Sequence, residues 1–224
     1  MSINKIAIVI NTWLPKQEDI QKSIENTENF DEKIIYFNEE TREFNDKNLP
    51  GFRVYGDGQN LSAADGFNFA IQQAKSDWIC NFCIDDWFDS EAINTLLTEI
   101  KNGKYDDYDI IKCPCYCGND IMKWKIVGDD SLDNLSEKIK EGNCITFSSI
   151  YKKRVWKEIG GLKNEPFNDW GWWMRVVKRG YKIFNYPIPT YYWQIHQGQL
   201  FQKEIDQHGY ENIKQSLLNK VKEF

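Results

Sequence analysis

The chain has 224 residues, of which 34 are acidic and 28 basic, giving a formal net charge of -6. Acidic and basic residues are interspersed, so the total charge gives no support to general nucleic-acid binding. No stretch reaches the apolar length of a membrane span, and the N-terminal MSINKIAIVIN turns polar too early for a signal peptide. We therefore expect a cytoplasmic protein of one globular domain, without stable membrane insertion.

Short apolar or β-branched runs alternate with segments of helical spacing in the first half of the chain, which is typical of βαβ units and a mostly parallel sheet. The predicted strands are 5–11, 33–37, 52–56 and 78–84. Ser62 and Asp65 resemble a capping box at the start of a helix, whose apolar face is Phe67, Ala70, Ile71 and Ala74. A second helix ends at Gly103, and its apolar face is Ala92, Ile93, Leu96, Leu97 and Ile100.

The second half of the chain predicts strands at 109–114, 144–151, 181–187 and 191–196, with an irregular polar segment at 123–134. Gly160 and Gly161 end a helical turn at 154–159. Asn168 and Asp169 precede a helix that ends at Gly180. A C-terminal amphipathic helix is indicated by Ile213, Leu217, Val221 and Phe224.

The six cysteines lie mostly inside apolar runs, where reduced thiols behave as small hydrophobic groups. Cys80 and Cys83 have the CxxC spacing of zinc ligands, but a strand would point them to opposite faces of the sheet. Cys113, Cys115 and Cys117 alternate along one strand face, an arrangement that does not wrap tetrahedrally around one ion. The sequence therefore disfavours a structural zinc site.

An adjacent pair of carboxylates, Asp85 and Asp86, follows the apolar run 78–84. Ligands of open α/β sheets bind outside the carboxyl ends of the strands. Carboxylate oxygens bind hard cations, and Mg²⁺ is usually shared between carboxylates and substrate phosphates. The pair therefore indicates a nucleotide enzyme, with a turn or cap role for the two aspartates as the alternative.

Six segments resemble, in order, the motifs of glycosyltransferase family 2: IAIVINTW, FNEETRE, NLSAADGFNFAIQQAKSDW, CIDDW, GGLKNEPFNDWGWWMRVVKRGYKI and WQIHQ. Members of this family move a sugar from a nucleoside diphosphate with inversion of configuration. The resemblance implies the GT-A fold, a Rossmann-like, mostly parallel central sheet flanked by helices in a single domain. It divides the chain into a donor-binding half (1–104), an acceptor-binding and catalytic half (105–200) and the C-terminal amphipathic helix (201–224).

The same resemblance implies a divalent metal, Mn²⁺ or Mg²⁺, at the acidic pair. Asp86 is the preferred metal contact, and Asp85 holds the metal or the ribose-phosphate part of the donor. This sequence departs from a full D-x-D motif, because the third position is Trp87 or the first is Ile84. His196 completes the metal shell or contacts the diphosphate, with a purely structural histidine as the alternative. Further donor contacts, with a UDP-sugar as the default donor, are implied at Thr12, Asn38, Glu39, Asn60 and Asn68.

Asp169 matches the family's general base, which takes the proton of the acceptor hydroxyl. Its alternative role is to cap the helix that follows. Helical spacing places Trp170, Trp173 and Met174 in the core, whereas Trp172 lies on a different face and could stack on a sugar or a base. Trp170 and Trp172 are our candidates for acceptor or sugar contacts.

These patterns predict a metal-dependent inverting glycosyltransferase with a glycan as acceptor. One alternative acceptor is a hydroxymethylated base in viral DNA, which requires local basic patches such as Lys152-Lys153-Arg154 to grip phosphate. Another alternative is a nucleotide-sugar binder without catalysis, motivated by the incomplete acidic motif. A sugar-phosphate nucleotidyltransferase is disfavoured, because the segment NTWLP after the first strand contains no Gly-rich phosphate loop.

Overall fold

The computed structural model describes residues 4–12, 17–25, 27–38, 49–56, 61–119, 121–196 and 199–223. Its centre is a seven-stranded sheet with the strand order β10-β6-β9-β4-β1-β2-β3. β1 pairs in parallel with β2 and β4, whereas β9 is antiparallel to both of its neighbours. The strands are β1 (Ile6–Thr12), β2 (Glu32–Phe37), β3 (Arg53–Tyr55), β4 (Trp78–Phe82), β6 (Ile110–Lys112), β9 (Ile150–Lys152) and β10 (Ile183–Asn185). The predicted mostly parallel α/β sheet is confirmed.

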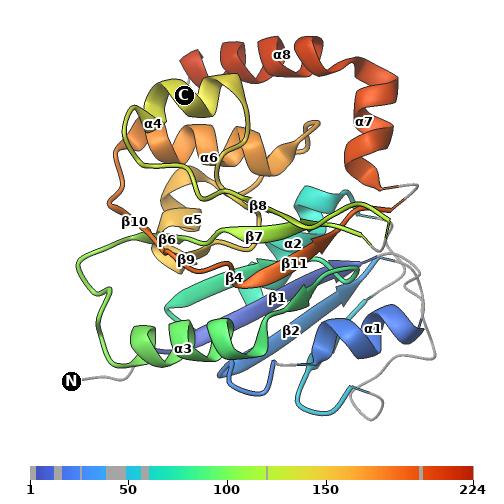
Figure 1. Ribbon diagram of the computed structural model, residues 1–224, viewed down its shortest axis with the longest axis vertical. Coiled ribbons are helices and arrows are strands. Elements are labelled where there is room, and N and C mark those ends of the chain that lie inside the picture. Colours follow the sequence, from blue (N-terminus) through green and yellow to red (C-terminus); the bar gives the residue numbers. More distant parts are fainter. Residues whose placement is uncertain are drawn as a thin grey trace.

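Helices cover both faces of this sheet, as Figure 1 shows. The central strand β1 is buried along its whole length, and its side chains enter two separate cores alternately: Val9 enters one and Ile8 and Ile10 the other. A strand buried on both faces is a continuous apolar run, which is why it could be predicted. The first core is covered by α2 (Ala63–Gln73), α4 (Leu135–Glu141), α5 (Lys153–Ile159), α6 (Asn168–Arg179) and α8 (Tyr210–Glu223), and the second by α1 (Gln17–Ile24) and α3 (Ser90–Lys101).

A second sheet of four short strands, in the order β5-β11-β7-β8, crosses in front of the main sheet in Figure 1. Phe88, Cys115 and Tyr191 on its inner face join the core that α3 covers. Its strands are β5 (Trp87–Phe88), β11 (Tyr191–Gln194), β7 (Cys115–Gly118) and β8 (Lys125–Val127). The segment 123–134, expected to be irregular, therefore contains one strand. Because β11 pairs with β5, the second sheet brings the late part of the chain to the acidic pair.

Two predicted elements have different bounds in the structure. The expected strand 144–151 forms only as β9, because residues 146–149 make a turn in which the Ser149 N–H donates to the Thr146 carbonyl at 3.1 Å. The segment 201–224 is two helices, α7 (Leu200–His208) and α8, which separate at Gly209 with a φ of 74°. Ile213 and Leu217 are buried on α8, as its amphipathic spacing predicted.

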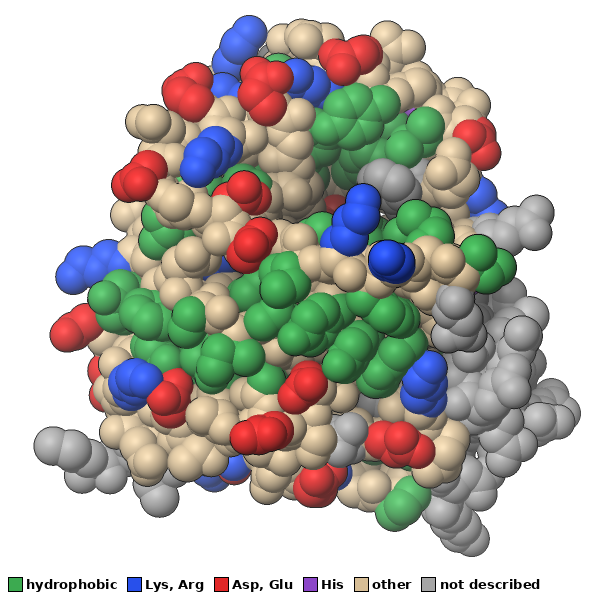
Figure 2. All heavy atoms as spheres, in the orientation of Figure 1, with side chains coloured by type: hydrophobic (Ala, Val, Ile, Leu, Met, Phe, Trp, Pro, Cys, Tyr) green, Lys and Arg blue, Asp and Glu red, His purple; other side chains and the backbone are tan. Residues whose placement is uncertain are grey.

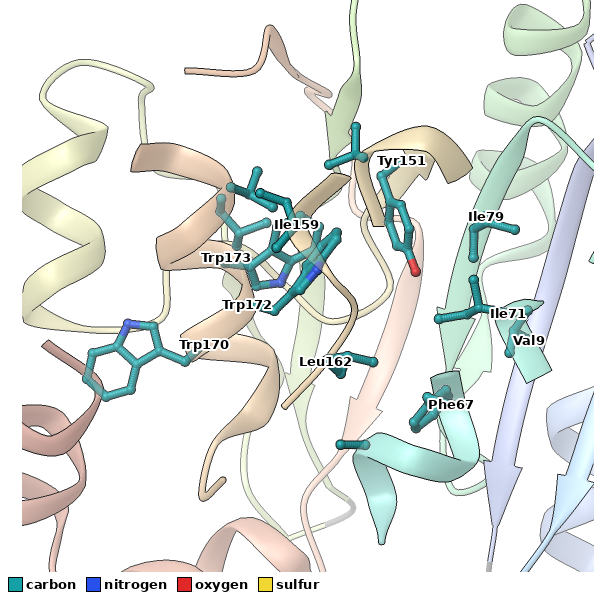
Figure 3. Packing of buried hydrophobic residues seen from close by; sticks show 14 of the residues in the cluster. Val9, Phe67, Ile71, Ile79, Tyr151, Ile159, Leu162, Trp170, Trp172 and Trp173 are labelled. Carbon is teal, nitrogen blue, oxygen red and sulfur yellow. The ribbon is translucent and has the colours of Figure 1, made fainter. Parts of the chain in front are cut away.

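The tryptophans of α6 anchor this helix from two sides, as Figure 3 shows. The rings of Trp172 and Trp173 point toward Tyr151 of β9, with ring centroids 4.7 and 6.1 Å from it. Trp170 points away from them, and its Nε1–H donates to the Ile139 carbonyl of α4 at 2.6 Å. Among the described residues, no helix is long and apolar enough to cross a membrane.

Candidate active site

A tight turn at the end of β4 carries the acidic pair. β4 ends at Phe82, and the Asp86 N–H donates to the Cys83 carbonyl at 3.3 Å, so Cys83 and Asp86 are the first and last residues of the turn. The Cys83 Sγ and one carboxylate oxygen each of Asp85 and Asp86 lie within 4.8 Å of one another. Three groups able to bind a metal ion therefore meet at the carboxyl end of β4, where α/β sheets bind their ligands.

The strand β11 adds two contacts to this turn. The Gln194 N–H donates to the Asp86 Oδ1 at 3.1 Å. The His196 Nε2 lies 2.7 Å from the Asp85 Oδ2. The three residues predicted to form the metal site are thus brought together, from segments that are far apart in the sequence.

Burial and mutual repulsion dominate the electrostatics of the turn. Burial and the charge of Asp85 raise the pKa of Asp86 well above its usual range, and the Gln194 N–H opposes this only in part. Burial, followed by the charges of Asp86, Asp85 and Asp169, also raises the pKa of the Cys83 thiol. Neighbouring carboxylates resist ionising together unless a cation compensates them. A divalent ion therefore fits this set of ligands, with Asp85, Asp86 and His196 as the residues able to hold it.

Asp169 lies in the first turn of α6, close enough to the acidic turn for its charge to act on Cys83. It is not the N-cap, because Phe167 takes that position with a left-handed backbone (φ 51°) and without a side-chain cap bond. The Asn143 Nδ2 donates to the Asp169 Oδ2 at 2.7 Å. Burial nevertheless raises the pKa of Asp169 to about 6, against hydrogen bonds from Asn143 and from the N–H groups of Trp170 and Asp169. Such a group is ionised near neutral pH and can accept a proton.

One face of the molecule is hollowed. Figure 2 shows a hollow between the layer of α6 and α8 and the strands of the second sheet, with an acidic side chain visible inside it. A band of hydrophobic side chains crosses the same face below the hollow. α6 of the upper layer carries Asp169, and β5 of the second sheet directly follows the acidic turn.

At the carboxyl ends of β1 and β2, the side-chain amides of Asn11 and Asn38 are hydrogen-bonded to each other. Asn38 is fully buried, and its Nδ2 donates to the Asn11 Oδ1 at 2.6 Å. The Asn38 N–H donates to the Thr12 carbonyl at 2.9 Å, and the Asn11 Nδ2 donates to the Ala63 carbonyl at 3.2 Å. A Cβ at position 66 would lie 2.4 Å from the Asn11 Oδ1, so Gly66 is required for α2 to approach. Asn11 was not predicted as a site residue, although a glycine on the buried face of a helix, here Gly66, signals such a close approach.

The other predicted donor contacts have different outcomes. Glu39 and Asn60 lie outside the described residues. The amide of Asn68 is engaged with the loop after α5: its Nδ2 donates to the Leu162 carbonyl at 2.8 Å, and its Oδ1 accepts from the Leu162 N–H and the Trp156 Nε1–H, both at 2.9 Å. Asn68 therefore positions this loop, and its contact with a donor stays a prediction.

Both tryptophans proposed as sugar contacts are core residues, so this expectation is corrected. Trp170 and Trp172 are 1% and 2% exposed. The Trp170 ring stacks on Tyr210 of α8 at 5.7 Å, and the Trp172 ring lies against Tyr151 and Trp173. Helical spacing correctly placed Trp172 on a different face of α6 from Trp170. It could not reveal that β9 covers one face and α8 the other.

Comparison with solved structures identifies the fold as GT-A. The crystal structure of S. aureus TarS 1-349 in complex with UDP-GlcNAc matches with a TM-score of 0.68 and 12% sequence identity, covering 88% of this chain and 60% of that chain. The TarS 1-349 complex with UDP gives a TM-score of 0.68, 14% identity and coverages of 98% and 72%. The mannosyltransferase PcManGT from Pyrobaculum calidifontis, in complex with GDP-Man and Mn²⁺, matches with a TM-score of 0.67 and 10% sequence identity, covering 96% of this chain and 64% of that chain.

At identities of 10–14%, these matches show the GT-A fold alone. The model of the family "Glycosyl transferase family 2" matches residues 20–160, more than half of the chain. The chain therefore belongs to glycosyl transferase family 2. It spans only 60% of the TarS 1-349 chain in the UDP-GlcNAc complex. A comparison with curated protein sequences found no significant match.

Proposed function

We propose that this protein transfers a sugar from a nucleoside-diphosphate sugar to an acceptor hydroxyl, with inversion of configuration and with a divalent metal ion. The observation that carries the proposal is the meeting of Asp85, Asp86 and His196 at the end of β4, within electrostatic reach of Asp169. Family membership supports the reaction class. The similar structures contain UDP-GlcNAc, UDP, or GDP-Man with Mn²⁺, which supports a nucleotide-sugar donor and a divalent ion.

In the proposed reaction, the acceptor oxygen attacks C1 of the donor sugar while the bond between C1 and the diphosphate oxygen breaks. Asp169 accepts the hydroxyl proton, and its pKa of about 6 suits a general base that works near neutral pH. A bound Mn²⁺ or Mg²⁺ would neutralise the charge of the leaving diphosphate. Asp85 and Asp86 would hold that ion, with the Gln194 N–H fixing the orientation of the Asp86 carboxylate.

The two halves of the chain would have different roles in this reaction. The half 1–104 would bind the donor through Thr12, Asn38 and the acidic turn, with Glu39, Asn60 and Asn68 as further donor contacts. The half 105–200 would supply the base Asp169 and the late histidine His196. A UDP-sugar is the donor that we propose first.

A donor panel tests this proposal. The protein is incubated with UDP- and GDP-sugars and either Mn²⁺ or Mg²⁺, and the release of nucleoside diphosphate is measured with and without a chelator. We expect release from one donor that the chelator abolishes. Saturable donor binding with no release, even when glycan acceptors are supplied, would instead favour a nucleotide-sugar binder without catalysis.

The stereochemistry of the reaction has a separate readout. An α-linked donor processed by a single displacement gives a β-configured first product, whether the acceptor is a glycan or water. Proton NMR of the anomeric region, recorded before the sugar equilibrates in solution, distinguishes the two anomers. An α-configured first product would contradict inversion and a single-displacement role for Asp169.

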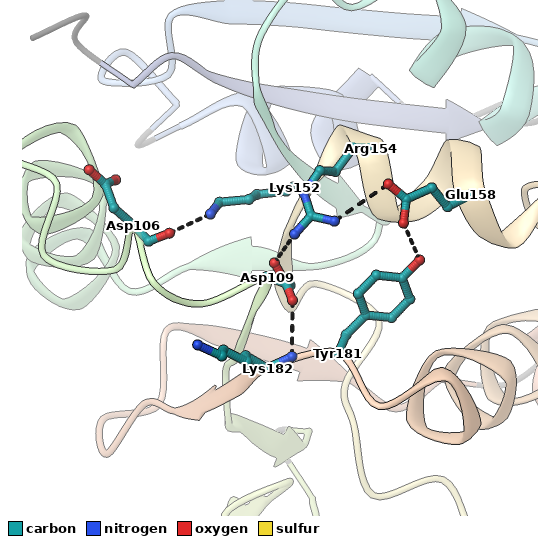
Figure 4. A network of polar contacts seen from close by, with 7 residues as sticks. All are labelled: Asp106, Asp109, Lys152, Arg154, Glu158, Tyr181 and Lys182. Carbon is teal, nitrogen blue, oxygen red and sulfur yellow. Dashed lines mark hydrogen bonds and ion pairs between the residues drawn. The ribbon is translucent and has the colours of Figure 1, made fainter.

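Glycans remain the acceptor that we propose, ahead of modified DNA. The basic residues that would contact DNA phosphates already bind partners within the protein (Figure 4). The Lys152 Nζ donates to the Asp106 carbonyl at 2.6 Å, and Arg154 forms an ion pair with Asp109. The Lys153 Nζ donates to backbone carbonyls at the end of α2. Binding of hydroxymethylated duplex DNA with a steep salt dependence would reverse this preference.

A further inference from the structure

The acidic turn contains a third group able to bind a metal ion, the thiol of Cys83. As first and last residues of the turn, Cys83 and Asp86 face each other across it. The Cys83 Sγ lies within 4.8 Å of a carboxylate oxygen of Asp85 and of Asp86. Cys80 and Cys83 were both expected inside the strand, on opposite faces of the sheet, but β4 ends at Phe82, so Cys83 leaves the strand and lies beside the carboxylates.

Cys83 differs from the thiols that only fill space. Cys80 and Cys113 are fully buried, and their Sγ atoms lie 3.5 and 3.4 Å from the backbone carbonyls of Ser148 and Ile111. Cys83 is half-buried beside two carboxylates. A thiol among carboxylates at the open end of a strand is placed as a ligand would be.

We propose that Cys83 is a direct ligand of the divalent cation, together with Asp85 and Asp86, and that its sulfur makes this site favour borderline ions such as Zn²⁺ and Co²⁺ over Mg²⁺. This inference rests on the metal site of the proposed function. The three turn residues alone have their ligand atoms within 4.8 Å of one another, and the His196 Nε2, 2.7 Å from the Asp85 Oδ2, would become a fourth ligand by turning from that oxygen toward the ion. Sulfur, nitrogen and two oxygens form a tetrahedral set that suits Zn²⁺ and Co²⁺.

The three ligand atoms of the turn need only local adjustment to bind one ion. Zinc binds sulfur at about 2.3 Å and carboxylate oxygen at about 2.0–2.2 Å, so neighbouring ligand atoms in a tetrahedral site lie roughly 3.5 Å apart. Side-chain rotation in the turn closes the remaining distance from the present limit of 4.8 Å. On binding, the thiol proton leaves to solvent as the metal–sulfur bond forms, and no group changes its oxidation state.

Selectivity follows from ligand type. Carboxylates and water alone suit Mg²⁺ and Mn²⁺, whereas a thiolate adds affinity for softer ions. Zn²⁺ is therefore expected to compete with Mn²⁺ at this turn. Removing the sulfur should lower the ratio of Zn²⁺ to Mg²⁺ affinity on the order of 10- to 100-fold, the range seen even for groups that only support metal ligands.

Cobalt titration tests the proposal without relying on activity. Co²⁺ bound by a thiolate gives a near-ultraviolet charge-transfer band, which we expect in the wild-type protein and in Cys144→Ser but not in Cys83→Ser. Cys144 is a matched control, because it is also a half-buried thiol but lies beside Lys112 and away from the acidic turn. Cys83→Ala is the second variant, and thermal unfolding monitors the fold of all three.

Three outcomes would overturn the proposal: no charge-transfer band in the wild type, a band that survives in a folded Cys83→Ser or Cys83→Ala variant, or a band lost in Cys117→Ser instead. Cys117 is the relevant alternative, since the charge of Asp86 also acts on it. Failure here is distinguishable from failure of the proposed function. If Mn²⁺-dependent donor turnover is present without a cobalt–sulfur band, only the role of Cys83 is wrong.

Discussion

Replacing Asp169 by asparagine removes a charge while keeping the shape of the side chain, and the structure predicts opposite effects on stability and activity. Raising the pKa from 3.8 to about 6 corresponds to about 3 kcal/mol of free energy against the ionised form. Because the side chain is only half-buried, solvent screening reduces this to about 1–2 kcal/mol. This cost is fully present above pH 6 and is relieved as the pH falls toward 4, since the folded state then binds the proton more tightly than the unfolded state.

At pH 8 we therefore expect Asp169→Asn to be at least as stable as the wild type, and up to about 1–2 kcal/mol more stable in urea unfolding. Its turnover should fall by about 10²–10⁴-fold, the usual contribution of a general base. In the wild type, kcat/KM should decrease about tenfold per pH unit below pH 6, because protonated Asp169 cannot accept the hydroxyl proton. Asp107 is an exposed carboxylate after α3, so Asp107→Asn is the matched control and should change neither the free energy of unfolding nor the turnover.

A structural aspartate would behave differently. If Asp169 served mainly to stabilise the start of α6, its replacement would lower the free energy of unfolding by about 0.5–2 kcal/mol and leave the pH dependence of residual turnover intact. That combination would refute the assignment of Asp169 as the base.

Three further substitutions test the surroundings of the site. The hydrogen bond from Asn143 lowers the pKa of Asp169, so Asn143→Ala should raise this pKa and move the acidic decline of kcat/KM to higher pH. An unchanged pH profile would contradict this. Asn68→Ala should reduce the free energy of unfolding by about 2–3 kcal/mol in urea, since two hydrogen bonds to Leu162 and one to Trp156 of α5 are lost. Weaker donor binding at unchanged stability would instead favour a direct donor contact. Trp172→Ala should reduce the free energy of unfolding by about 3–5 kcal/mol, because it removes a buried aromatic side chain. A specific rise in KM with no loss of stability would instead favour Trp172 as a sugar contact.

The central strands and the helices α2, α3, α5 and α6 could be predicted because local patterns determine them. β1 and β4 are runs buried on both faces. Ser62 is the N-cap of α2, and its Oγ accepts from the Asp65 N–H as the capping pattern indicated. Of the second sheet only β11 was predicted, as the strand 191–196. The strands β5, β7 and β8 could not be predicted, because they have two to four residues and depend on pairing between distant segments. Short strands carry too few residues for a periodic signal.

The residue types that meet at the candidate site could be read from the sequence, but their contacts could not. The apolar Ile84 extended the expected strand past its real end at Phe82, which hid the turn that joins Cys83 to the acidic pair. Asn143 is 26 residues from Asp169, and no local pattern connects them. His196 was expected near the metal from the family resemblance, and its position beside Asp85 depends on the pairing of β11 with β5.

The most direct test of the central claim compares nucleoside-diphosphate release by the wild type and by Asp86→Asn, with Mn²⁺ titrated into both and calorimetry measuring donor binding in parallel. We predict Mn²⁺-dependent release by the wild type, and release that is slower by several orders of magnitude in a folded Asp86→Asn variant. Replacing one of the two carboxylates should weaken binding of the ion that would neutralise the leaving diphosphate. Equal release by the two proteins, or release that is indifferent to Mn²⁺, would contradict the account.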